Sequence, residues 1–63
     1  MKIIRIADAD RAIPLTGVAI ETHKNVLGQF YALTYVNGII KNRKTTGYCK
    51  TESGAIASAK RGL

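Results

Sequence analysis

The residues between Gly28 and Gly62 determine the fold of this chain, and they read GQFYALTYVNGIIKNRKTTGYCKTESGAIASAKRG. Residues 30–36 are mostly aromatic or β-branched, and such residues favour an extended chain. The segment from Phe30 to Val36 is therefore predicted to be a strand. Asn37-Gly38 comes next and is typical of a two-residue hairpin turn, because both turn residues must adopt a positive φ.

This turn sets the register of the two strands that it joins. Counting outward from it, the facing pairs are Val36 with Ile39, Tyr35 with Ile40, Thr34 with Lys41, Leu33 with Asn42, Ala32 with Arg43 and Tyr31 with Lys44. Facing residues share one side of a sheet. One side then carries Phe30, Ala32, Thr34, Val36, Ile39, Lys41 and Arg43, and the other carries Tyr31, Leu33, Tyr35, Ile40, Asn42 and Lys44.

Either side of this hairpin would serve as the side that a helix covers. The side with Tyr31, Leu33 and Tyr35 has the larger apolar residues, and we expect it to form the core. If Phe30 anchors the core instead, the other side is covered.

A short helix is predicted after Thr51. Thr51 is a good N-cap, Glu52 suits the positive end of the helix dipole, and Lys60 and Arg61 suit its negative end. Gly62 is a natural stop. An apolar stripe at helical spacing comprises Ala55, Ile56, Ala59 and Leu63.

The residues before Gly28 predict two further strands. Ile3, Ile4 and Ile6 favour a strand over residues 2–7, and residues 18–22 favour another. Asp8 and Asp10 mark a turn between them, since aspartate bonds to backbone two residues on. Residues 23–28 are expected to form a loop. Short polar connections suggest a meander, so the sequence predicts one α+β domain over residues 1–63, an antiparallel sheet of three or four strands packed by one C-terminal helix.

The charge of the chain is strongly positive and unevenly distributed. Ten basic and four acidic residues give a net charge of +6 at pH 7. In residues 38–63, Glu52 is the only acidic residue, and the basic ones are Lys41, Arg43, Lys44, Lys50, Lys60 and Arg61. A dense positive charge on one half of a chain attracts polyanions such as nucleic acid. The other interpretation is that the charge only keeps a small protein in solution.

The residue types that carry catalysis are sparse. His23 is the only histidine and Cys49 the only cysteine, too few for a zinc site or an intrachain disulfide. We therefore expect neither an enzyme nor a cofactor. The single thiol favours a reducing, cytoplasmic location. The sequence has no run of about 20 apolar residues, so we expect no membrane partner.

Basic residues interleaved with tyrosines are the one functional signal. Lys41, Arg43 and Lys44 are predicted to contact phosphate, with Lys50, Lys60 and Arg61 as outer charges. Tyr31, Thr34 and Tyr35 lie opposite the basic strand, and tyrosines stack on exposed bases if a target is single-stranded. The alternative is that the tyrosines belong to the core and the charges are only solvated.

Two families resemble the C-terminal half. The ethylene-response-factor domain and its integrase-type relatives have a Gly-Lys-Phe/Trp-x-Ala run similar to residues 28–32 and a Gly-x-Phe-x-Thr-x-x-x-Ala run similar to residues 47–55. That resemblance implies DNA binding by a three-stranded sheet backed by a helix, with Tyr31, Leu33 and Tyr35 on the DNA-facing side. Cys49 stands where that family has an aromatic residue, and the segment between Gly38 and Gly47 is longer.

The YegP-like family of small bacterial domains also resembles this half. Its aromatic strand, Asn-Gly turn, Gly-Tyr pair and alanine-rich helix are similar to residues 30–36, 37–38, 47–48 and 55–60. The resemblance implies the fold, and pairing of repeats or protomers through the sheet.

The sequence thus leads to two functional hypotheses. The first is non-enzymatic binding of nucleic acid, DNA in particular, through a basic sheet face; it predicts that replacing Lys41, Arg43 and Lys44 with alanine removes most of the affinity. The second is a protein-interaction module, such as a phage- or mobile-element-encoded regulator or inhibitor that docks on a larger host protein. A homodimer formed by sheet pairing is compatible with both.

Overall fold

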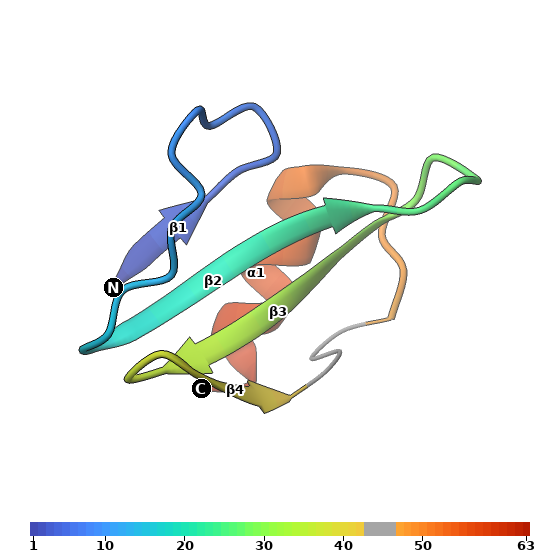
Figure 1. The fold of residues 1–63 in the computed structure, drawn as a ribbon. Coiled ribbons are helices and arrows are strands. Elements are labelled where there is room, and N and C mark those ends of the chain that lie inside the picture. The colour runs from blue at the N-terminus through green and yellow to red at the C-terminus, as the bar shows by residue number, and fades with distance from the viewer. Residues whose placement is uncertain (43–46) are drawn as a thin grey trace.

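The protein is an α+β fold in which one helix packs on one face of a four-stranded sheet (Figure 1). A computed structural model describes residues 1–42 and 47–63. The sheet has the order β1-β2-β3-β4, and the chain ends in a single described helix. The elements are β1 (Lys2–Ile4), β2 (Val18–Lys24), β3 (Phe30–Val36), β4 (Ile39–Asn42) and α1 (Glu52–Arg61). The predicted fold class is confirmed, and the strand β3 has the predicted bounds.

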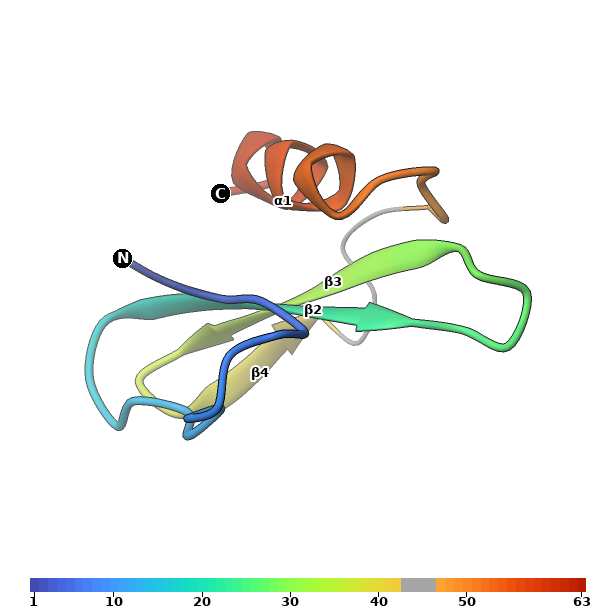
Figure 2. The ribbon, with the colours of Figure 1, turned by 90° about the horizontal axis from the view of Figure 1, so that it is seen from above.

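Strand β1 departs from the predicted meander because it runs parallel to β2, with Ile3 opposite Ile20. A parallel neighbour needs a crossover connection, and residues 5–17 provide it by passing below the sheet, on the side away from α1 (Figure 2). The turn expected at the aspartates is present: Asp10 Oδ1 accepts a hydrogen bond from Ala12 N at 3.0 Å.

Two strand boundaries also differ from the prediction. Strand β1 ends at Ile4, not at residue 7, because side chains bind the next backbone N–H groups: Asp8 accepts from Arg5 N at 2.7 Å and Glu52 accepts from Ile6 N at 2.8 Å. Strand β2 continues through His23 and Lys24, which were expected in a loop, because their backbones pair with Tyr31 and Phe30.

The β3–β4 hairpin has the predicted turn and only part of the predicted register. Asn37 and Gly38 adopt φ values of 51° and 80°, and Val36 pairs with Ile39 and Tyr35 with Ile40. Beyond that point the register shifts, so that Thr34 pairs with Asn42 and not with Lys41. Lys41 is thus one extra residue on β4, a bulge that counting outward from the turn cannot foresee.

The shift makes the predicted pairs Thr34–Lys41 and Leu33–Asn42 wrong. The predicted pairs Ala32–Arg43 and Tyr31–Lys44 involve residues 43 and 44, which lie outside the described residues. After that segment the chain returns to the same edge of β3, where Cys49 pairs with Phe30 in an antiparallel bridge.

Helix α1 begins and ends as predicted. The Thr51 side chain accepts a hydrogen bond from Gly54 N at 3.0 Å, Lys60 and Arg61 occupy the last turn, and Gly62 is the C-cap. Ala55, Ile56 and Ala59 are buried, whereas Leu63 lies past the helix and is exposed. Within the described residues, no helix is long and apolar enough to cross a membrane.

The helix covers the opposite sheet face from the one expected. Its Ala55 and Ala59 pack on Ile20 and Ala32, with Phe30 and Cys49 at the border of this core. The prediction favoured the face with Tyr31, Leu33 and Tyr35 because those side chains are larger. Small residues on both surfaces let a helix approach a sheet closely, so Ala32 opposite the helix alanines decides the side.

Candidate nucleic-acid interface

The sheet face away from α1 brings the candidate aromatic residues together. We call it the tyrosine face; it carries Lys2 and Ile4 of β1, Ala19, Glu21 and His23 of β2, Tyr31, Leu33 and Tyr35 of β3, and Ile40 of β4. These residues alternate along their strands with the core residues under the helix. The crossover connection of residues 5–17 lies on this side of the sheet (Figure 2).

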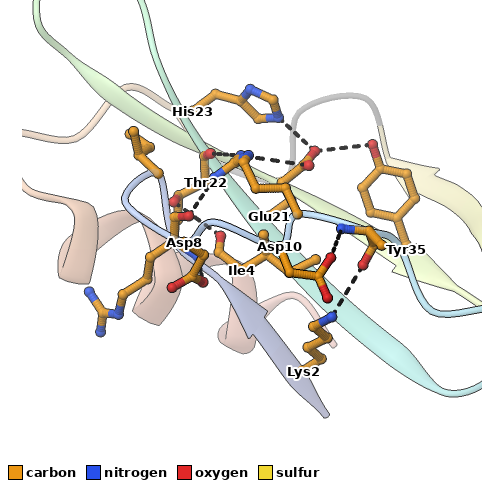
Figure 3. Close-up of polar contacts among 12 residues, drawn as sticks. Lys2, Ile4, Asp8, Asp10, Glu21, Thr22, His23 and Tyr35 are labelled. Atoms are coloured by element: carbon orange, nitrogen blue, oxygen red, sulfur yellow. Dashed lines mark hydrogen bonds and ion pairs between the residues drawn. The ribbon is translucent and has the colours of Figure 1, made fainter.

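Glu21 is the polar centre of the tyrosine face. Its carboxylate is nearly buried and lies 3.6 Å from Nη2 of Arg11, which reaches it from the crossover connection. Oε1 of Glu21 is 2.7 Å from His23 Nε2 and accepts a longer bond of 3.4 Å from the Tyr35 hydroxyl. Figure 3 shows His23 and Tyr35 both pointing at this carboxylate. The charge of Glu21 is therefore compensated within the fold.

Arg11 ties the crossover connection to the sheet as well as to Glu21. Its Nη2 donates to Thr22 O at 2.8 Å, and its Nη1 donates to Arg5 O. This guanidinium is thereby committed to internal bonds.

Tyr35 is held as a neutral phenol. Burial raises its pKa above the ordinary value, and the neighbouring Glu21 carboxylate, which opposes a second negative charge, raises it further. At neutral pH the hydroxyl is consequently a donor to Glu21.

Three aromatic rings meet at the end of the tyrosine face where β2 and β3 are joined. The rings of His23 and Tyr31 stack with centroids 5.4 Å apart and planes inclined by 16°. Tyr48 meets Tyr31 edge-on at 5.7 Å, with planes at 90°. The bridge between Cys49 and Phe30 places Tyr48 here, because the residue before an inward-facing Cys49 faces outward.

His23 and Tyr48 were not among the residues that the sequence predicted for the interface. The signal for His23 was its position two residues after Glu21 on β2, which puts both side chains on one face once the strand is extended. No local signal showed that Tyr48 returns to β3, since the pairing spans the hairpin and residues 43–46.

The predicted interface residues do not all gather on one surface. Tyr31 and Tyr35 lie on the tyrosine face, but Thr34 lies on the helix side and is only 1% exposed. Thr34 therefore cannot touch a ligand in this fold.

The predicted basic residues are spread over the sheet edge and the helix. Lys41 is exposed on β4, and Lys50 is exposed just after the Cys49 bridge. Lys60 and Arg61 are exposed in the helix layer, and Arg43 and Lys44 lie outside the described residues.

All four acidic side chains make bonds within the fold. Glu52 accepts from Thr22 Oγ1 at 2.6 Å and from Ile6 N at 2.8 Å, and it lies 3.4 Å from Arg5 Nη1. Asp8 and Asp10 bind backbone N–H groups in the crossover connection, and Glu21 binds as described above.

Among the described residues, Lys41, Lys50, Lys60 and Arg61 have no ion-pair partner.

The described residues provide no concave site. In residues 1–42 and 47–63 there is neither a pocket nor a group of three metal-ligating side chains.

No family model, no curated protein and no solved structure matches this chain. The resemblances to the ethylene-response-factor domain and to the YegP-like domains are therefore predictions from short motifs.

Proposed function

We propose that this protein binds nucleic acid without catalysing a reaction, and that the tyrosine face and the lysines at its border form the binding surface. The observation that carries the proposal is the aromatic cluster of His23, Tyr31 and Tyr48 on a sheet face that the helix leaves uncovered. Aromatic rings on a sheet face that the helix does not cover, with lysines nearby, provide stacking for bases and charge for phosphates.

The distribution of charge supports this proposal. The acidic side chains bind inside the fold, and Arg5 and Arg11 neutralise two of them. The positive charge that an approaching ligand meets thus comes from exposed lysines. Of these, Lys41 lies on β4, which borders β3, and Lys50 follows the bridge of Cys49 to β3. A phosphate backbone gains affinity from such contacts by releasing counterions.

The position of the helix is also consistent with the resemblance to the ethylene-response-factor domain. That resemblance implies that Tyr31, Leu33 and Tyr35 face DNA, and these residues lie on the sheet side opposite α1. DNA is therefore the first nucleic acid to test.

The test is a fluorescence-anisotropy titration of labelled duplex and single-stranded DNA at about 50 mM and about 200 mM salt, where several phosphate contacts cost orders of magnitude in affinity. Two double variants have equal charge, K41Q/K50Q at the sheet and K60Q/R61Q in the helix layer. The plot of log affinity against log salt has a negative slope. We expect K41Q/K50Q to reduce the magnitude of that slope by about 2, one for each lost phosphate contact.

The control is K60Q/R61Q, whose salt dependence of affinity should stay closer to that of the native protein. Equal losses in the two variants would show that net charge, and not the tyrosine face, determines binding. The absence of binding at the lower salt concentration would overturn the proposal.

A second candidate function, docking on a larger protein, is favoured by the hairpin tip between β2 and β3. Val26 is fully exposed and Leu27 is 79% exposed there. Hydrogen bonds within the tip hold its conformation. Asn25 Oδ1 accepts from Leu27 N and Gln29 N, both at 2.9 Å, and Gly28 adopts a φ of 82°. A rigid turn that displays two apolar side chains can fill a pocket on a partner at little entropic cost.

This candidate predicts a partner that binds in high salt and through the tip. Immobilised protein should retain one protein from a nuclease-treated extract of its source cells, and the variant V26S/L27S should not retain it. The two residues are exposed, so the variant should fold as the native protein does. Equal retention by both would exclude the tip as the contact.

A further inference from the structure

We infer that the ligand of the tyrosine face is a single strand of DNA or RNA whose unpaired bases stack on the cluster of His23, Tyr31 and Tyr48. This inference rests on the proposed function and narrows it to one class of nucleic acid. It follows from what the tyrosine face contains and from what it lacks.

The tyrosine face is poor in the groups that read a duplex. Base edges in the major groove are recognised chiefly by Arg, Lys, Asn and Gln side chains. Among the paired residues of the described strands, only Lys2 is of these types on this face, and its Nζ donates to Ala12 O at 3.3 Å. Arg11 reaches the same face but is occupied by Glu21 and the backbone carbonyls of Arg5 and Thr22. Apart from Glu21, whose carboxylate is bonded to Arg11, His23 and Tyr35, the β2, β3 and β4 residues of this face are Ala19, His23, Tyr31, Leu33, Tyr35 and Ile40. Aromatic and aliphatic side chains suit the flat faces of unpaired bases.

The aromatic cluster presents rings in two orientations. His23 and Tyr31 are nearly parallel, whereas Tyr48 stands at 90° to Tyr31 and is 51% exposed at the border of the face. Stacking on exposed aromatic rings is the main sequence-tolerant contact of proteins with single strands. Since Tyr48 is the most exposed of the three tyrosines, a base would meet it first.

The charges around the cluster suit the phosphates of such a strand. Lys50 is two residues from Tyr48 in the chain, and Lys41 lies on β4 at the far edge of the sheet from β1. The carboxylate on this face, that of Glu21, is compensated by Arg11 and bonded to His23. A nucleic-acid strand bound along β3 and β4 would thus have aromatic rings for its bases at one end of the face and lysines for its phosphates at the border.

The decisive experiment compares two single strands of equal length and charge, one with thymine bases and one built of abasic sites, at about 50 mM salt. Phosphate contacts are the same in both strands, so any difference in affinity measures contacts to bases. We expect the abasic strand to bind at least about tenfold more weakly, since each stacked base contributes about that much. A duplex of the same length should also bind more weakly than the thymine strand.

Two variants of Tyr48 localise the effect. Y48F keeps the ring and should keep the preference for the strand with bases, whereas Y48A should lose most of it. Both variants should retain the salt dependence of the native protein, because Lys41 and Lys50 are unchanged.

Tyrosine fluorescence provides a second readout that needs no label. The chain has three tyrosines and no tryptophan, and Tyr31 and Tyr35 lie on the tyrosine face with Tyr48 against Tyr31. Stacked bases should quench this emission, and the abasic strand should quench it less.

The outcomes separate this inference from the proposed function. Equal affinity for the two strands, or tighter binding of the duplex, would overturn base stacking while leaving nucleic-acid binding in place. Absence of binding to every probe would overturn both.

Discussion

Thr22 and Thr34 show how much the surroundings of one side chain matter. Both are completely or almost completely buried, and they lie on the helix side of neighbouring strands. The Thr22 hydroxyl lies 2.6 Å from Glu52 Oε2 and 3.3 Å from Ile4 O. The Thr34 hydroxyl has no hydrogen-bond partner among the residues that the structure describes. A buried hydroxyl without a partner costs free energy, whereas a bonded one stabilises the fold.

Replacing each threonine with valine should therefore destabilise the fold at Thr22 and not at Thr34. T34V should leave the free energy of unfolding unchanged or raise it by about 1 kcal/mol, because it removes an unbonded polar group. T22V should lower it by about 1.5–3 kcal/mol, the usual value of a hydrogen bond to a charged group. Urea denaturation followed by circular dichroism measures both. A T34V loss as large as that of T22V would contradict this account of Thr34.

At the scale of elements, α1 depends on its cap and on its docking. It spans Glu52–Arg61, and so short a helix is marginal in isolation. The cap bond from Gly54 N to Thr51 Oγ1 therefore matters for the helix, and the alanines dock it on β2 and β3.

T51A should lower the free energy of unfolding by about 1 kcal/mol, because it leaves a backbone N–H of the first turn without its acceptor. The matched control is S53A, an exposed position two residues on, which should stay within about 0.5 kcal/mol of the native protein. Thermal unfolding of the two variants gives the comparison. A loss in S53A equal to that in T51A would show that the cap bond is not the cause.

At the scale of the whole molecule, Glu52 joins three segments that are distant in the chain. It stands at the start of α1, accepts from Thr22 on β2, and accepts from Ile6 N just after β1. Those bonds lower the pKa of its carboxyl below the ordinary value of 4.5, the Thr22 hydroxyl contributing most, then Ile6 N–H, then Arg5, while desolvation opposes them. The ionised form is therefore favoured by folding.

The lowered pKa of Glu52 predicts a pH dependence of stability. The unfolded carboxyl takes up its proton at a higher pH than the folded one, so the stabilisation is present above pH 4.5 and is lost as the pH falls through the lower folded pKa. E52Q should cost about 1–2 kcal/mol at neutral pH and much less in strong acid. Denaturant titrations of both proteins along a pH series give the difference curve. A difference that does not shrink on acidification would contradict the assignment.

The sequence by itself determined the elements whose chemistry is local. Strand β3, the Asn37-Gly38 turn and the Thr51 cap depend on residues within a few positions of one another, where propensity and backbone hydrogen bonds decide. The class of fold followed from these elements, and so did Tyr31 and Tyr35 as members of one face.

Only the tertiary structure decided how the distant parts meet. The parallel direction of β1, the bulge at Lys41, the side that α1 covers and the return of Cys49 to Phe30 all depend on contacts between residues far apart in the chain. Close packing of Ala32 against Ala55 and Ala59 outweighed the larger apolar side chains of the tyrosine face. That choice buried Thr34 and left Tyr31 beside Tyr48, with Tyr35 on the same face. Packing selects among arrangements that local propensity leaves equal, because it depends on the fit of two surfaces and not on either sequence segment alone.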